Sequence, residues 1–278
     1  MIYREYFECL RGLFDAYYQE AGEAKMGEVK YASLESQLGN APCLCEDTEE
    51  MFWLRESDDY ESRVKLGNLL AGQYRFREAL DAYRTAERIR ADDPMLFIRL
   101  GGAYLTLRLF DEAQRAYEKS LSLGGDEKSV AYPMGVWYYL QGKYQQAADS
   151  FAKVLPCGGE MEIAILYWNA LCCMRGNLTD NLLPTYRDDM QVGHHTAYRS
   201  AVEVFLGKRA AEEVLRLAEQ DRNDLDAVVL MYGIAIYLEH CGKKTEVEAV
   251  IKSLLCRESV WPSISYLAAW NDMSATDC

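Results

Sequence analysis

Two short clusters in this chain carry residue types that can bind a metal ion. Cys43 and Cys45 are separated by one residue, and His194 is followed directly by His195. Thiolate and imidazole groups are preferred zinc ligands, but structural zinc sites combine two ligand pairs at set spacings. Neither cluster has a second pair at such a spacing. The sequence therefore predicts that the protein holds no metal ion.

The chain also lacks the residue patterns of common active sites. Its three histidines form no HExxH arrangement, and there is no Walker loop, no GxSxG elbow and no glycine run for a dinucleotide. We therefore expect no enzyme activity, no catalytic residue and no cofactor. An alternative is that the protein is a hydrolase or a regulatory enzyme subunit with a site around His194 and His195. Bound metal or chelator-sensitive turnover would support this alternative.

The charge of the chain limits the partners that it can bind. Its 278 residues carry a formal net charge of -14. Proteins that bind nucleic acids or anionic membrane surfaces use Lys and Arg to neutralise phosphate groups. We therefore expect no nucleic acid and no membrane among the partners, which leaves basic proteins or partners that are not chosen by charge.

Much of the negative charge lies in residues 41–61, which we call the acidic segment. The apolar run from Met51 to Leu54 interrupts its acidic residues. The composition allows three interpretations: a solvated linker, an acidic start to the first helix of a repeat, or an acidic and aromatic docking segment. Acidic residues favour the first turn of a helix because they interact with its dipole.

The sequence favours a cytoplasmic location. Residues 1–8 mix charges of both signs with apolar residues and lack the apolar core of a signal peptide. No stretch of about 18 apolar residues is present to span a bilayer. The nine cysteines are odd in number and irregularly spaced, which is typical of reduced thiols.

The elements that position these residues follow from a repeat between Leu66 and Phe151. At a constant step, this stretch keeps five columns of like residues through three copies. The columns are Gly67, Gly101 and Gly135; Leu70, Tyr104 and Tyr138; Phe76, Phe110 and Tyr144; Ala79, Ala113 and Ala147; and Tyr83, Tyr117 and Phe151. The small residues let paired helices lie close together, and one pair cannot bury its apolar face alone, so the units must stack.

This period and residue pattern resemble the tetratricopeptide repeat (TPR) family. The resemblance implies an all-α fold, a right-handed α-solenoid of antiparallel helix pairs with a concave face. Three repeats are clear in the sequence, and diverged repeats and capping helices surround them. Such arrays are general adaptors, so the fold alone does not supply a function.

We expect three regions along the chain. Residues 1–59 hold helices near 1–21 and 26–38 and most of the acidic segment. Residues 60–156 hold the clear repeats, at 60–93, 94–127 and 128–156, with first helices near 60–71, 95–107 and 129–140 and second helices near 76–90, 111–123 and 144–155. Residues 157–278 hold a fourth unit whose second helix Pro184 breaks, diverged pairs around Gly207 and Gly242, and a capping helix near 260–270. Pro133 implies that its helix begins near Ser129 or bends.

In the resembled family the first helices line the concave face, and this geometry carries over to an apolar groove. The predicted partner-binding residues are Asn68, Ile98, Leu105, Tyr132, Val136, Tyr139 and Leu166. Some members of the family clamp a carboxylate tail of heat-shock chaperones with Lys, Asn and Arg. Here Asn68 matches the clamp asparagine, but Val64, Ser129 and Pro133 stand where Lys and Arg belong, so the clamp is absent.

An apolar groove of this size must be filled. The filler is either the chain itself, through its N-terminal helix or the run from Met51 to Leu54, or a partner protein or peptide. The leading hypothesis is a non-catalytic protein-interaction scaffold. The alternative is a chaperone, because the three-repeat core is similar to TPR chaperones of type III secretion translocators, which are acidic and hold apolar segments of their secreted clients. A structural role through self-association is a further possibility, and the sequence leaves the partner and the oligomeric state open.

Overall fold

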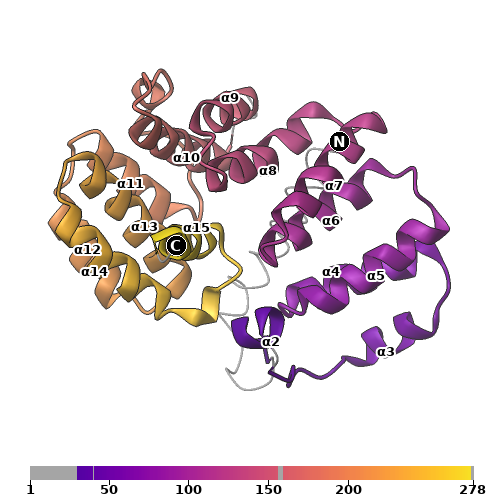
Figure 1. Cartoon of the computed structure of the whole chain (residues 1–278). Helices are drawn as coiled ribbons and strands as arrows, with labels where there is room; N and C mark the ends of the chain where they lie inside the picture. Colours follow the sequence, from indigo (N-terminus) through magenta and orange to yellow (C-terminus); the bar gives the residue numbers. More distant parts are fainter. Residues whose placement is uncertain (1–29, 40, 156–158, 277–278) are drawn as a thin grey trace. The chain divides into compact units, whose positions relative to one another are not determined.

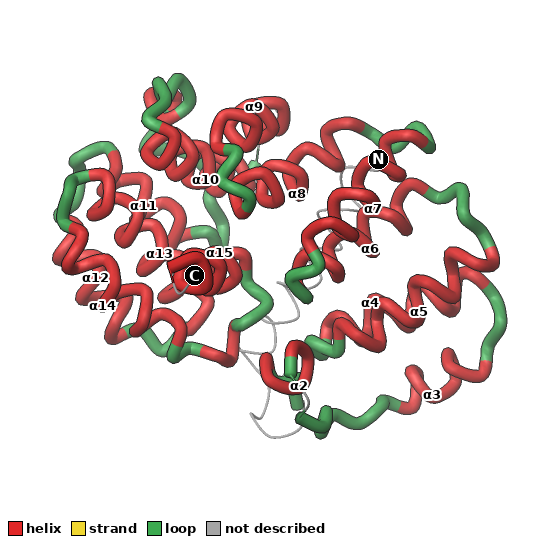
Figure 2. The backbone as a smooth tube through the Cα atoms, in the orientation of Figure 1, coloured by secondary structure: helices red, strands yellow, loops and turns green. Residues whose placement is uncertain are grey.

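The structure of the protein is a computed structural model that describes residues 30–39, 41–155 and 159–276. These residues form helices joined by turns and contain no strand, as the sequence predicts (Figure 2). Contacts between Cα atoms divide the chain into two units, Met1–Pro133 and Met134–Cys278, which are described separately. The region boundaries predicted after residues 59 and 156 and the right-handed superhelix remain predictions. The helix predicted at 1–21 lies outside the described residues.

Unit 1 contains the first two clear repeats as helical pairs (Figure 1). Its helices are α2 (Leu34–Leu38), α3 (Glu49–Glu56), α4 (Tyr60–Gly72), α5 (Phe76–Ile89), α6 (Pro94–Thr106) and α7 (Phe110–Ser122). α4 packs on α5, α5 on α6, and α6 on α7, while α3 packs on α4. Each predicted helix of these repeats is present with its ends displaced by one residue at most.

The glycine column explains why paired helices come so close. A Cβ atom built on Gly67 would lie 2.3 Å from Cε1 of Tyr83, and one on Gly101 would lie 2.3 Å from Cε1 of Tyr117. In unit 2 a Cβ on Gly135 would lie 2.9 Å from the ring of Phe151. The predicted role of the column is confirmed: in every clear repeat an aromatic ring of the second helix rests on the backbone of the first.

A second column, which the sequence analysis missed, shapes the turn inside each pair. Tyr74, Arg108 and Gly142 hold the same position in successive repeats, and each has a positive φ, of 63°, 62° and 68°. Gly207 and Gly242 end the first helices of the later pairs with φ of 70° and 80°. In all five of these pairs, a residue in the left-handed conformation follows the end of the first helix. The diverged C-terminal pairs therefore use the turn of the clear repeats.

The helices of unit 2 follow the predicted order. They are α9 (Tyr144–Val154), α10 (Met161–Gly176), the 3-10 turn η2 (Leu183–Thr185), α11 (Thr196–Phe205), α12 (Ala211–Gln220), α13 (Asp224–His240), α14 (Lys244–Leu255), η3 (Glu258–Val260) and α15 (Ile264–Thr276). As predicted, no α-helix forms around Pro184, and an irregular segment runs from Asn177 to His195. The last helix begins four residues later than predicted, because η3 occupies its expected start.

The helix that carries Pro133 begins slightly earlier than expected, and its bending remains a prediction. α8 (Glu127–Leu140) begins two residues before Ser129, so Pro133 lies in its interior, where it lacks the N–H that would bond the carbonyl of Ser129. Asp126 supports the early start, since its carboxylate accepts from the backbone N–H of Ser129 at 2.9 Å. The division between the two units falls directly after this proline.

Candidate functional site

Most of the predicted groove residues have buried side chains. Ile98, Leu105, Tyr132, Val136, Tyr139 and Leu166 are all 7% exposed or less, and Asn68 is half-buried. Ile98 and Leu105 lie on α6, Tyr132, Val136 and Tyr139 on α8, and Leu166 on α10. These side chains do not form an exposed surface in the protein as it stands, and partner binding by them remains a prediction.

Tyr139 belongs to the core of unit 2. Its ring makes an edge contact with Trp168 at 5.4 Å, and its hydroxyl lies 3.0 Å from the hydroxyl of Tyr232 on α13. Tyr232 also donates to Asp272 on α15 at 3.0 Å, and Arg175 bonds the same carboxylate at 2.7 Å. In unit 2 the chain therefore covers part of its own predicted groove with α13. The predicted filling of the groove by the N-terminal helix lies outside the described residues.

Asn68 is occupied inside its own repeat. Its side-chain oxygen accepts a hydrogen bond of 2.8 Å from the hydroxyl of Tyr83. The equivalent position of the next repeat is Gly102, and the hydroxyl of Tyr117 is buried with no hydrogen-bond partner among the described residues. Burial raises the pKa of Tyr117. Asn68 on α4 thus helps to hold α5 against α4 through this hydrogen bond. Its predicted contact with a partner remains a prediction.

The most exposed aromatic pair of the described residues lies on α3. The side chains of Phe52 and Trp53 are 55% and 64% exposed, with ring centroids 5.6 Å apart in an edge-on arrangement. Met51, the preceding residue, is only 1% exposed. α3 therefore buries the side chain of Met51 and exposes the larger side chains of Phe52 and Trp53 to solvent.

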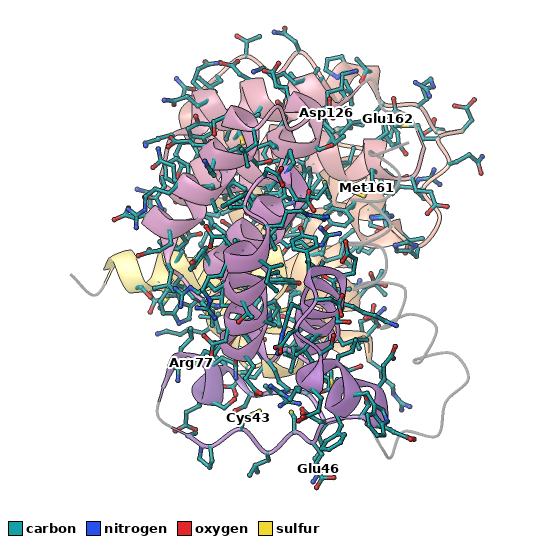
Figure 3. The ribbon with its side chains drawn as sticks, turned by 90° about the vertical axis from the view of Figure 1, so that its right-hand side faces the viewer. Cys43, Glu46, Arg77, Asp126, Met161 and Glu162 are labelled. Carbon is teal, nitrogen blue, oxygen red and sulfur yellow. The ribbon has the colours of Figure 1, made fainter. Side chains whose placement is uncertain are left out.

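Exposed carboxylates lie on the same helix as this aromatic pair and on the segment before it. They are Glu46, Glu49 and Glu56, and Figure 3 shows Glu46 on the segment before α3 with its side chain directed away from the helices. We call Phe52, Trp53 and these three glutamates the α3 surface. Of the three interpretations of the acidic segment, the acidic start of the first repeat helix is wrong, because α3 ends at Glu56 and α4 begins separately at Tyr60. Docking by the segment remains a prediction. Its exposed aromatic rings are the feature that the sequence could not locate.

A network of ion pairs around the buried Arg75 fixes α3 to the repeats. Arg75, which is 5% exposed, bonds Asp47 at 2.6 Å and Glu78 at 2.7 Å. Arg55 on α3 bonds the same two carboxylates, at 2.5 Å and 2.7 Å. Two cations shared by two anions satisfy most of the hydrogen-bonding capacity of the group. The α3 surface is therefore held in one position.

The network shifts the pKa values of its carboxyl groups. The hydrogen bond from Arg55, assisted by Arg75, lowers the pKa of Asp47 against the opposing effect of burial. Burial alone would raise the pKa of Glu78, but hydrogen bonds from Arg75 and Arg55 outweigh it and lower that pKa. Both groups are charged at neutral pH, when the network is complete.

A small polar pocket lies beside this network. It has a volume of about 130 Å³ and is lined by Arg55, Arg63, Leu66, Glu78, Asp81, Ala82 and Thr85. Pockets that bind drug-sized molecules or cofactors usually have about 300–1,000 Å³ and mainly apolar walls. This pocket is too small and too polar for such a ligand.

The two clusters of chemically active residues have different surroundings. The thiol of Cys45 donates to the carbonyl of Lys30 at 3.0 Å, and burial, with the neighbouring Cys43, raises the pKa of Cys45 to about 11. A thiol in that state is a poor nucleophile and a poor metal ligand. His194 and His195, in contrast, lie beside Glu160, and ligand atoms of the three residues are all within 4.8 Å of one another. No sequence pattern had pointed to Glu160.

No helix among the described residues is both long enough and apolar enough to cross a membrane.

No family model matches the chain. No curated protein matches it either. Among solved structures, the chain is similar to YrrB, described as a TPR protein with an unusual peptide-binding site. The TM-score is 0.43 and the sequence identity 14%, over 82% of this chain and 98% of that one.

Proposed function

We propose that the protein is a non-catalytic cytoplasmic scaffold that binds a basic segment of another protein through the α3 surface. The observation that carries the proposal is the exposure of Phe52 and Trp53, at 55% and 64%, on a helix that is otherwise fixed in place. The two rings lie side by side, and contiguous exposed apolar patches, unlike scattered single residues, are typical of interaction sites. Aromatic residues are also enriched among the anchors of protein interfaces.

The chemistry of the α3 surface favours a positively charged partner. The indole face of Trp is the best aromatic acceptor for Lys and Arg cations, and such contacts contribute about 0.5–2 kcal/mol each. Glu46, Glu49 and Glu56 add negative charge around the rings. The net charge of -14 attracts cationic segments over a longer range. A partner segment with Lys or Arg beside apolar residues would satisfy both parts of the surface.

The helical pairs supply the support that such a site needs. Arg75 lies in the turn between α4 and α5 and anchors α3 to the first repeat. The partner therefore meets a surface that is ordered before binding, which lowers the entropy cost of association.

The predicted groove supports a second proposal. Ile98 and Leu105 are apolar residues of unit 1 that suit an apolar client segment, as the chaperone alternative requires. Both are buried, so a client has to gain access to side chains that are not exposed in the free protein. The observations therefore favour the α3 surface over the groove.

A fluorescently labelled peptide that alternates Lys or Arg with Leu tests the proposal against two others, one acidic and one uncharged and apolar. We expect the basic peptide to bind the full chain, more weakly as salt increases. The double variant Phe52→Ala/Trp53→Ala, which keeps the net charge, should weaken binding about tenfold or more, as expected when interface anchors are lost. Leu217→Ala, which truncates a half-exposed leucine on α12, is the matched control.

Each outcome of this experiment is informative. Equal affinity of the native chain and the double variant would mean that the basic peptide senses only the overall charge, and the α3 surface would be excluded. Preferential binding of the uncharged apolar peptide would favour the chaperone alternative.

A further inference from the structure

We propose that Glu160, His194 and His195 form a binding site for a divalent transition-metal ion, with Zn²⁺ as the best fit. The site lies within unit 2, away from the acidic segment, and is independent of the proposed scaffold function. It also reverses the expectation from the sequence that the protein holds no metal.

The distances are close to those that a metal ion requires. Zinc binds imidazole nitrogen and carboxylate oxygen at about 2.0–2.2 Å, so two of its ligands in a tetrahedral site lie roughly 3.3 Å apart. Nδ1 of His194 lies 3.6 Å from Oε2 of Glu160, and the ligand atoms of the whole group lie within 4.8 Å of one another. Ligand atoms at the upper limit of 4.8 Å would have to approach by roughly 1.5 Å, through side-chain rotation, to reach this geometry.

The backbone brings the three side chains together from two places in the chain. Glu160 directly precedes α10, whose first residues Met161 and Glu162 are labelled in Figure 3. His195 directly precedes α11. Glu160 and His195 therefore stand at the starts of two helices of unit 2, and α10 and α11 pack on each other. This mutual packing fixes the separation of the two ligand positions.

Gly193 lets Glu160 reach the histidine pair. A Cβ atom on Gly193 would lie 2.2 Å from the carboxylate of Glu160, and the φ of Gly193 is +48°. The left-handed backbone favours glycine at this position, and a larger residue would also have to displace the carboxylate of Glu160. The carboxylate occupies the space that a side chain at position 193 would take.

The donor set selects among metal ions. Two imidazoles and one carboxylate suit Zn²⁺ and other late first-row ions, whereas Ca²⁺ and Mg²⁺ prefer six or more oxygen ligands. The side chains of Glu160 and His194 are 47% and 26% exposed, so solvent can reach the ion and supply a fourth ligand.

The position of the site indicates what a bound ion would do. The irregular segment from Asn177 to His195 replaces the second helix of the fourth repeat. Glu160 precedes α10, and the histidine pair ends the irregular segment that follows α10. An ion bound by these residues would therefore link the start of α10 to the end of the irregular segment. It would stabilise the part of unit 2 where the repeat pattern fails.

The test measures Zn²⁺ binding to the full chain by isothermal titration calorimetry, after chelator treatment and with exposed thiols blocked by N-ethylmaleimide. We expect one ion per chain, no comparable binding of Mg²⁺, and a Tm that rises with Zn²⁺. Loss of a neighbouring group that only supports a metal ligand weakens binding about 10–100-fold, so loss of a ligand should cost at least about tenfold.

Three variants and one control make the result specific. Glu160→Gln, His194→Ala and His195→Ala should each weaken Zn²⁺ binding, while His240→Ala, which removes an exposed histidine at the end of α13, should leave it unchanged. Glu160→Gln is a conservative change at an exposed position, so it keeps the test valid if a histidine variant folds poorly. Absence of Zn²⁺ binding to the native chain, or equal binding to Glu160→Gln and to both histidine variants, would overturn the proposal.

Discussion

The hydroxyl of Tyr139 on α8 lies 3.0 Å from the hydroxyl of Tyr232 on α13, and both side chains are buried. The guanidinium group of Arg175 lies over both rings, 5.7 Å and 5.9 Å from their centroids. It also bonds Asp272 and Glu239. One buried cation on α10 thus joins four other side chains from α8, α13 and α15.

Arg175→Met should strongly destabilise unit 2. The change leaves the carboxylate of Asp272 without its cation in a partly buried position, and removal of one member of a buried ion pair typically costs about 3–5 kcal/mol. Urea denaturation followed by circular dichroism measures the loss. Arg115→Met, which breaks the exposed pair with Glu112, should change the free energy of unfolding by less than about 1 kcal/mol. Similar losses for the two variants would contradict the role assigned to Arg175.

Two neighbouring glycines of α6 should respond in opposite directions to alanine. Gly101→Ala places a methyl group against the ring of Tyr117, and such overpacking typically costs about 1–3 kcal/mol. Gly102→Ala meets no atom within 4 Å and should stabilise the helix by about 0.5–1 kcal/mol. The two Tm values, measured side by side, check the prediction. A stabilised Gly101→Ala variant would show that the rings do not seat on the glycine column.

Tyr83 and Tyr117 occupy the same position in successive repeats, but removal of their hydroxyl groups should have opposite effects on stability. Tyr117→Phe removes a buried hydroxyl that has no partner among the described residues, so we expect a gain of about 1 kcal/mol in the free energy of unfolding. Tyr83→Phe removes the hydrogen bond to Asn68 and should cost about 1 kcal/mol. In the third repeat the corresponding residue is already Phe151. Equal effects in the two variants would count against the assigned hydrogen bonds.

The network under α3 predicts a dependence on pH. The pKa values of Asp47 and Glu78 are lower in the folded protein than their ordinary values of 3.8 and 4.5. Their contribution is therefore present above pH 4.5 and is lost as the pH falls through the lowered folded values. Denaturation of the native chain and of Asp47→Asn/Glu78→Gln, compared from pH 7 to pH 2, measures it. We expect the difference in unfolding free energy to be largest near neutral pH and to shrink in acid; a constant difference would rule the network out as its source.

The sequence predicted the helices well because their packing is local. The aromatic ring that seats on Gly67 or Gly101 belongs to the next helix of the same repeat, so a fixed spacing reveals it. Pro184 likewise acts on its own backbone. The turn column at Tyr74, Arg108 and Gly142 escaped notice because side-chain types vary there while the backbone conformation does not.

The candidate sites were less predictable because they depend on distant segments. The burial of Tyr139 comes in part from α13, and nothing in the period of the early repeats specifies what packs on them. The approach of Glu160 to His194 depends on the path of the irregular segment between α10 and α11. The exposure of Phe52 and Trp53 depends on the orientation of α3. That orientation is set by the ion pairs of Arg55 and Asp47 with distant residues of the first repeat.

The seating of the rings also limits how the length of this chain can change. In each clear repeat the same sequence separation joins the glycine to its ring, as in Gly67 and Tyr83, Gly101 and Tyr117, or Gly135 and Phe151. Inserting or deleting a single residue within either helix between them would turn the ring about 100° away from the glycine, since an α-helix has about 3.6 residues per turn. Whole repeats can be added or removed without this mismatch. The length of such a protein is therefore expected to grow or shrink by complete repeats through its clear region, with single-residue changes confined to the connections between pairs.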